Sequence, residues 1–383
     1  MSSALHLLHE AIAIPSVNPS HGDAPELSGE LRMAKWFQHQ LEERSLNVEL
    51  KDIMGPERPA VIGQNEVSNP TRSLMIEVHL DTVGTSGMTV DPFAGTVREG
   101  KIYGRGACDM KGSTCAMLAA LTTERIETLT QRGIKLLLVG APDEETGLSG
   151  SRILAKEGLR ADDAVILEPT RCQPVIAHKG AFWYELTLQG LAGHGSQPEK
   201  GVSTHEALAT LLPELYRIHH QEADAHVHPL LGTSTLNIGR IEGGKTFNVI
   251  PDHTRLELDR RVVAGEDPAR FAHRISGLLD RMTRDGHLTG GTLRLVGETP
   301  PFETHPESSL IQALQVAVGE NSSLQGTSWV SDASMFSQVC ENTVVFGPGD
   351  IAQAHTVDEF IELEQLDKGV EIFGRFLDAY GTA

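Results

Sequence analysis

Histidine and carboxylate side chains, which are common ligands of divalent metals, follow several apolar segments of this 383-residue chain. They are His79 and Asp81 after SLMIEV, Asp109 in GRGACDMKG, Glu144 and Glu145 after IKLLLVGAP, Glu168 after DAVIL, and His355 after TVVFG. Each one alone has an ordinary interpretation, such as an Asx turn or a helix N-cap. Together they would crowd several carboxylates at one place, which is costly unless cations neutralise them. The set therefore indicates a centre that binds two metal ions.

The apolar segments before these residues are predicted to be buried strands of one sheet. SLMIEVHL, 134–142, 163–169 and 343–347 are nearly continuous apolar runs, typical of strands covered on both faces. Helical patterns alternate with them, including a single helix predicted over 110–129. This alternation indicates an α/β fold in which helices flank a mostly parallel sheet. Ligands bind beyond the carboxyl ends of such strands, so the side chains are expected to converge there.

A different pattern occupies the middle of the chain. The segments predicted there are a strand, a helix, two strands, a helix and a strand, over 182–190, 203–220, 234–241, 254–263, 268–285 and 291–298. The order β-α-β-β-α-β is typical of a ferredoxin-like α+β unit. We therefore expect a catalytic domain of residues 1–178 and 300–383, interrupted by an inserted lid or dimerisation domain of residues 179–299.

The composition narrows the class of partner. The 52 acidic and 32 basic side chains leave a formal net charge of −20. Such an excess disfavours nucleic acids and anionic membranes as partners, because Lys and Arg bind phosphate groups. The N-terminus lacks the pattern of a signal peptide, no apolar run is long enough to span a bilayer, and the four cysteines form no C-x-x-C pair. A cytoplasmic location is the expectation.

Five motifs carry a resemblance to a known family. HLDTV, GRGACDMKG, APDEETG, LEPT and AHTVDEF follow one another between about residues 70 and 362. In this order they resemble the motifs of the di-zinc metallopeptidase and deacylase family. That family includes acetylornithine deacetylase, succinyl-diaminopimelate desuccinylase, aminoacylase and glutamate carboxypeptidase.

The resemblance implies a role for each residue of the predicted metal centre. Asp109 would bridge two Zn²⁺ ions per chain, for which Co²⁺ or Mn²⁺ could substitute. His79 and Glu168 would complete one site, and Glu145 and His355 the other. Asp81 would orient the His79 ring, Glu144 would be the general base, and the Asp109–Met110 peptide would be cis.

The resemblance extends to the inserted domain. His194, in GLAGHGSQPEKGVST, matches a family histidine that reaches the active site of the partner subunit, which implies a homodimer formed through the lid domain. Asn248 and Arg261 match positions that contact the substrate. Because side chains alternate along a strand, Arg260 and Arg261 are expected to point to opposite faces, so only one of them would contact the substrate. Arg261 is favoured for this contact by its position before V-V-A-G. This chain has Ala264 at a position where the family usually has a proline.

The function implied is metal-dependent hydrolysis of the amide bond of a small N-acyl amino acid. Within the family, the segments HKGAF and HGSQP resemble acetylornithine deacetylase, an enzyme of arginine biosynthesis, more than the other members. An acidic protein would also suit the cationic product of that enzyme, ornithine. Succinyl-diaminopimelate desuccinylase, an aminoacylase and a dipeptidase are the alternatives. A metal-binding scaffold without catalysis is an alternative of a different class, although a scaffold has no need to retain Glu144. The histidines between His219 and His228 are interpreted as a polar helix end rather than as a second metal site.

Overall fold

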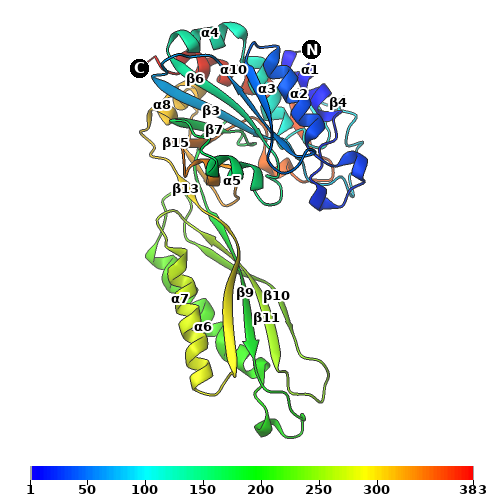
Figure 1. The fold of residues 1–383 in the computed structure, drawn as a ribbon, viewed down its shortest axis with the longest axis vertical. Helices are drawn as coiled ribbons and strands as arrows, with labels where there is room; N and C mark the ends of the chain where they lie inside the picture. The colour runs from blue at the N-terminus through cyan, green and yellow to red at the C-terminus, as the bar shows by residue number, and fades with distance from the viewer. Residues whose placement is uncertain (1, 383) are drawn as a thin grey trace. The chain divides into compact units, whose positions relative to one another are not determined.

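The chain divides into two units in a computed structural model that describes residues 2–382. Unit 1 comprises Met1–Ile176, Glu303–Gln325 and Ser331–Ala383. Unit 2 comprises Ala177–Phe302 together with Gly326–Val330. Unit 2 therefore interrupts unit 1 in the chain, as Figure 1 shows by its colours.

A nine-stranded mixed sheet forms the centre of unit 1, in the order β1-β2-β6-β3-β7-β15-β8-β13, with β14 paired to β8. The strands are β1 (Asn47–Asp52), β2 (Pro59–Gln64), β3 (Arg72–His79), β6 (Ile134–Ala141), β7 (Asp163–Ile166), β8 (Val175–His178), β13 (Phe302–Glu303), β14 (Gln325–Thr327) and β15 (Asn342–Val345). β6, β3, β7 and β15 are parallel, whereas β1, β2 and β8 pair antiparallel. The expected α/β fold with a mostly parallel sheet is confirmed.

Helices cover this sheet and form one large apolar core with it. They are α1 (Ser3–Ile12), α2 (Leu31–Glu42), α3 (Lys111–Ala120), α4 (Thr123–Gln131), α5 (Ser149–Lys156), α8 (Ser309–Val318), α9 (Ala333–Phe336) and α10 (Leu363–Ala379). Leu74, Ile76 and Val78 of β3 belong to the core, and Met75 and Glu77, which alternate with them, are buried as well. Both faces of the central strand are therefore covered.

The single helix predicted over 110–129 is wrong. The chain leaves the helical conformation at Leu121 and Thr122, between α3 and α4. Thr122 is extended, and its hydroxyl accepts the backbone N–H of Arg125, so it caps the second helix. The first backbone N–H groups of a helix have no acceptor within that helix, and a threonine N-cap supplies one.

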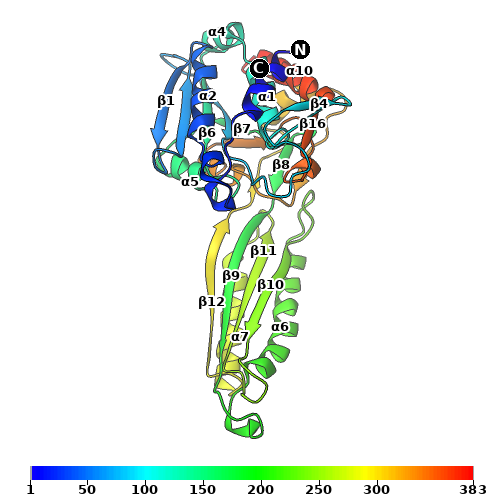
Figure 2. The ribbon, with the colours of Figure 1, turned by 90° about the vertical axis from the view of Figure 1, so that its right-hand side faces the viewer.

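Unit 2 has the predicted ferredoxin-like order of elements. β9 (Gly180–Gln189), α6 (Thr204–Ala225), β10 (Thr235–Gly243), β11 (His253–Val262), α7 (Pro268–Arg284) and β12 (Gly290–Thr299) form a sheet of order β10-β11-β9-β12 with two helices. Figures 1 and 2 show α6 and α7 side by side along this sheet. Their apolar residues and those of β9 and β11 form a second, separate core.

A small third sheet in unit 1 joins distant parts of the chain. β5 (Lys101–Tyr103) pairs with β4 (Thr96–Arg98) and with β16 (Phe360–Glu362). This pairing brings the segment before β16 beside the loop that follows β5, and that loop carries Asp109. Among residues 2–382, no helix is long and apolar enough to cross a membrane.

Candidate metal centre

The register of the parallel strands aligns the predicted ligands at one edge of the unit 1 sheet. His79, the last residue of β3, pairs with Ala141 at the end of β6, and Glu77 pairs with Ile166 at the end of β7. Glu168 therefore follows β7 at the level where His79 ends β3. Strands that run the same way end at the same edge, which explains why groups far apart in the chain meet there.

Asp109 lies between the two histidines. One of its carboxylate oxygens is 3.1 Å from Nε2 of His79, and the other is 3.2 Å from Nε2 of His355. Glu168 lies 3.9 Å from the His79 nitrogen, and Glu145 lies 2.9 Å from the His355 nitrogen. Each histidine thus has one carboxylate of its own and shares Asp109, and the Asp109–Met110 peptide is cis.

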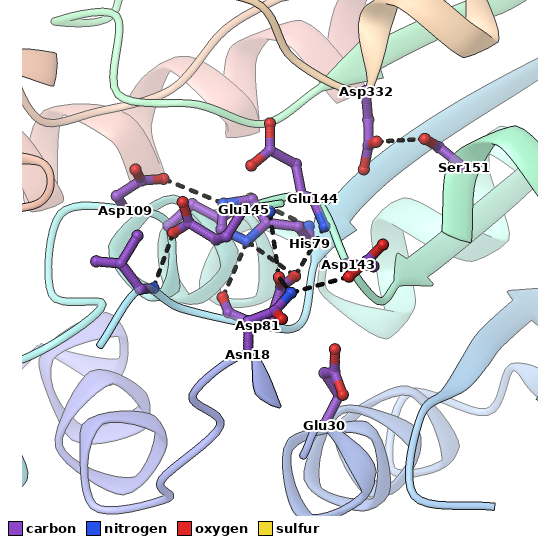
Figure 3. A network of polar contacts seen from close by, with 12 residues as sticks. Asn18, Glu30, His79, Asp81, Asp109, Asp143, Glu144, Glu145, Ser151 and Asp332 are labelled. Atoms are coloured by element: carbon purple, nitrogen blue, oxygen red, sulfur yellow. Dashed lines mark hydrogen bonds and ion pairs between the residues drawn. The ribbon is translucent and has the colours of Figure 1, made fainter. Parts of the chain in front are cut away.

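Glu144 belongs to the same cluster. Ligand atoms of His79, Glu144 and Glu168 lie within 4.8 Å of one another, as do those of His79, Asp109 and Glu145. Figure 3 shows the Glu144 carboxylate close to the His79 ring. The structure therefore brings all of the predicted catalytic-domain residues to one place.

Asp81 contacts the His79 ring through its backbone. Nδ1 of His79 is 3.0 Å from the carbonyl oxygen of Asp81 and 3.8 Å from the Asp81 carboxylate. That carboxylate instead accepts the backbone N–H groups of Glu144 and Glu145, at 3.1 and 3.2 Å. Asp81 thus connects the end of β3 to the turn after β6.

Glu359 is a buried residue at this site that the sequence analysis missed. Its carboxylate accepts the backbone N–H groups of Gly106, Cys108 and Asp109, at 2.9–3.0 Å, and a guanidinium N–H of Arg105 at 2.6 Å. It therefore holds the loop that presents Asp109. Glu359 lies within the motif AHTVDEF, four residues after the predicted ligand His355, and this position could have indicated that it belongs to the site.

The histidines and Asp109 stabilise one another's charged forms. Burial alone would raise the pKa of Asp109, but hydrogen bonds from His355 and His79 outweigh it and lower that pKa. Hydrogen bonds to Asp109 and Glu145 raise the pKa of His355 to about 10. Burial opposes the charge on His79, yet its pKa is raised well above the usual value by Asp109 and the neighbouring glutamates.

The three glutamates carry more negative charge than the histidines balance. Burial, and next the Asp109 charge, raises the pKa of Glu145 to about 7 and that of Glu168 well above its usual value. Burial also raises the pKa of Glu144. Buried carboxylates with raised pKa values gain ionisation when a cation binds, and nitrogen and oxygen donors in this number suit divalent metal ions. The donor set therefore fits a dinuclear metal centre.

In unit 2, the predicted residues His194 and Asn248 lie on adjacent exposed segments. Val249 forms a β-bridge with His194, and the backbone N–H of Gly195 donates to the carbonyl of Asn248 at 2.9 Å. Nδ1 of His194 is 2.7 Å from the Ser196 hydroxyl. The two side chains are thus presented by one local structure.

The two arginines of β11 point to opposite faces. Arg260 is fully buried, pairs with Glu266 and lies over the Phe271 ring, 4.5 Å from its centroid. Arg261 is partly exposed and pairs with Asp259 at 3.0 Å. Of the two, Arg261 is the one that a ligand could reach.

The histidines between His219 and His228 form no metal cluster among residues 2–382. His219 is buried, and Nδ1 of His228 accepts the backbone N–H groups of Leu230 and Leu231, which caps a turn.

Comparison with known proteins places the chain in a family. A sequence profile of peptidase family M20/M25/M40 matches residues 75–379, which is most of the chain. The chain belongs to this family. It is 30% identical over 331 residues to an acetylornithine deacetylase of Myxococcus xanthus, covering 85% of this chain and 84% of that protein. It is 31% identical over 378 residues to an acetylornithine deacetylase of Shigella sonnei, covering 94% of this chain and 92% of the relative.

Solved structures of similar fold cover nearly all of the chain. A putative aminohydrolase from methicillin-resistant Staphylococcus aureus has a TM-score of 0.77 at 18% identity, covering 98% of this chain and 96% of its own. A metallo-carboxypeptidase of the M20 family from Sulfolobus solfataricus has a TM-score of 0.72 at 21% identity, with full coverage of both chains. With the candidate ligands above, these findings identify a metal-dependent hydrolase of the M20 family.

Proposed function

We propose that this M20 hydrolase removes the acyl group from a small N-acyl amino acid, with N-acetylornithine as its substrate. The similarity to two acetylornithine deacetylases over most of the chain supports this substrate. A cationic product also suits a protein with a net charge of −20. The proposal places the enzyme in arginine biosynthesis.

The observation that carries the proposal is the position of Asp109 between His79 and His355. In the proposal, His79, Asp109 and Glu168 would hold one zinc ion, and Asp109, Glu145 and His355 would hold the other. Cobalt or manganese could occupy the same donors. When bound, two such ions make a water molecule more acidic and polarise the scissile carbonyl.

Glu144 is proposed to move the proton. It would accept a proton from the attacking water and donate it to the amide nitrogen as the carbon–nitrogen bond breaks. One carboxylate can perform both transfers because they occur in sequence. Its turn is anchored by Asp81, which accepts the Glu144 backbone N–H.

Unit 2 is proposed to form a homodimer and to contribute to substrate binding. The His194 side chain would donate a hydrogen bond to the oxyanion at the active site of the partner subunit. Asn248 and Arg261 would bind the substrate, because a planar guanidinium suits an α-carboxylate. The exposure of His194 and Asn248 and the partial exposure of Arg261 are what such roles require.

A hydrolysis panel tests the substrate. The protein is incubated with Zn²⁺ or Co²⁺ and with N-acetylornithine, N-succinyl-diaminopimelate, N-acetylated neutral amino acids or dipeptides, and free amine is measured. We expect the highest kcat/KM for N-acetylornithine. A higher value for N-succinyl-diaminopimelate, for the neutral amino acids or for the dipeptides would refute this substrate, and no hydrolysis of any of them would refute the proposed class of reaction.

Glu144→Gln tests the proposed base in the same panel. The variant should retain its bound metal but lose kcat by about 10³-fold or more, because Gln cannot accept the proton. Glu371→Gln, on the exposed face of α10, is the matched control and should leave kcat unchanged. Full activity of Glu144→Gln would show that another group is the base.

A further inference from the structure

A buried asparagine from the N-terminal segment joins two carboxylates beside the metal centre. The Nδ2 atom of Asn18 donates to Asp81 at 2.8 Å and to Asp143 at 3.0 Å. Asn18 is fully buried, and its own backbone N–H donates to the carbonyl of Thr82 at 2.9 Å. Figure 3 shows the amide between the two acidic side chains.

An arginine extends this arrangement. Nη2 of Arg58 donates to the same oxygen of Asp143 at 2.8 Å and to Glu30 at 2.6 Å, and its Nε donates to both oxygens of Glu30. The Glu30 side chain is fully buried, whereas that of Arg58 is 16% exposed. Arg58 is therefore held by Glu30 and directed at Asp143.

Asp143 and Asp81 in turn hold the turn that carries Glu144 and Glu145. Asp143 has a positive φ of 72°, which a non-glycine residue rarely adopts, and its carbonyl accepts the N–H of Leu148 at 2.8 Å. Asp81 accepts the N–H groups of Glu144 and Glu145. The Asp81 carboxylate and the Asp143 backbone thus support the turn. The carboxylates of both residues accept hydrogen bonds from donors earlier in the chain.

We propose that Asn18 and Arg58 are positioning residues, which align Glu144 and Glu145 by anchoring Asp81 and Asp143. The inference rests on the proposed function for the role of Glu144 as base. Asp81 and Asp143 would repel each other if they stood side by side without donors. The amide of Asn18 supplies one N–H to each, and Arg58 supplies the cation that Asp143 faces. Neither residue has an atom among the candidate metal ligands.

The geometry accounts for the choice of these residue types. An aspartate at position 18 would have nearly the same shape but would offer an acceptor where two donors are needed. A lysine at position 58 would keep the charge but could not present the planar set of donors that joins Glu30 to Asp143. Loss of either set of donors releases the turn and so displaces the proton-transfer group and a metal ligand together.

Asn18→Ala and Arg58→Lys test the proposal, and Asn65→Ala is the matched control. Asn65 is also a buried amide of unit 1, bonded to Thr130, Ile134 and Leu136, but it lies near the start of β6, whereas the turn follows the end of that strand. The control therefore loses a similar set of hydrogen bonds about 20 Å from the site.

Two readouts separate positioning from folding. The first is kcat and KM for the substrate that the wild type hydrolyses, measured on folded, metal-loaded protein. The second is the Zn²⁺ affinity of chelator-treated protein, measured by calorimetric titration, which needs no substrate. We expect both test variants to lose kcat by 10-fold or more, with KM within about threefold, and to bind the weaker of two Zn²⁺ ions about 10-fold less tightly.

The proposal is overturned if Arg58→Lys retains kcat and Zn²⁺ affinity within threefold of the control. The same outcome for Asn18→Ala overturns it too, and Asn18→Ser is the substitute if the alanine variant does not fold. If the wild type hydrolyses no N-acyl amino acid, the proposed function fails. The Zn²⁺ titration still tests whether Asn18 and Arg58 position Glu145.

Discussion

Removal of the Glu359 carboxylate should weaken unit 1 more than the loss of one ion pair. Glu359 is 1% exposed and accepts four hydrogen bonds, three of them from the backbone of the loop that presents Asp109. In Glu359→Ala these N–H groups lose their acceptor, and the buried guanidinium of Arg105 loses its counter-ion. The remaining acceptors of Arg105 are the carbonyls of Gly84 and Thr356.

The size of the effect follows from this burial. Breaking a buried ion pair by removing one partner costs about 3–5 kcal/mol. Each buried N–H left unsatisfied adds about 1–3 kcal/mol, less where water enters the space left by the side chain. We therefore expect a loss of about 4 kcal/mol or more in the free energy of unfolding. For a unit of this size, that corresponds to a fall of roughly 10 °C in Tm.

Thermal unfolding followed by circular dichroism, in chelator-treated protein, measures this loss without a contribution from bound metal. Glu371→Ala, which removes an exposed partner of Arg375 on α10, is the control and should change stability by less than about 0.5 kcal/mol. Replacing both Arg105 and Glu359 with Met should recover part of the loss, because no buried charge is then left unpaired. A fall in Tm of less than about 2 °C for Glu359→Ala would refute the reasoning.

Three further predictions concern metal, subunit contact and pH. Glu145→Gln should lower the bound metal measured by mass spectrometry towards one ion per chain, because it removes the carboxylate beside His355; retention of two tightly bound ions would contradict the assignment. His194→Ala should lower kcat at least 100-fold while sedimentation still shows a dimer, and unchanged turnover would exclude the oxyanion role. Burial lowers the pKa of His178 from 6.5, its value in the unfolded chain, to about 4 in the folded protein. Between about pH 4 and pH 6.5 the imidazole is therefore protonated only in the unfolded chain. Its contribution to stability is complete above pH 6.5 and falls by roughly 3 kcal/mol as the pH approaches 4. His178→Leu should therefore show a weaker loss of stability on acidification than the wild type in urea titrations, and parallel curves would contradict this.

The types of residue at the candidate metal centre could be predicted because they follow strands whose apolar character is plain in the sequence. SLMIEV and IKLLLVGAP end in His79 and in the turn of Glu144, and parallel strands bring their ends together. The order of elements in unit 2 was predictable for the same reason, since strand alternation and helical periodicity are local patterns.

Contacts that depend on the path of the backbone could not be predicted in this way. Asp81 was expected to orient the His79 ring, but the sequence did not indicate by which atom; in the structure its carbonyl is the closer group. The carboxylate is directed at the N–H groups of the turn 63 and 64 residues further along the chain. Which atom of a residue faces a neighbour is decided by packing, on which the local sequence pattern carries no information.

The sequence by itself determined which side chains could bind metal and which strands would carry them, because both depend on residue type and short-range periodicity. The tertiary structure decided how those side chains are held. Glu359 reaches the Asp109 loop across 250 residues, and Asn18 reaches Asp143 across 125. Such contacts arise only when the whole unit has folded, since hydrogen bonds between buried groups form wherever packing leaves a donor facing an acceptor.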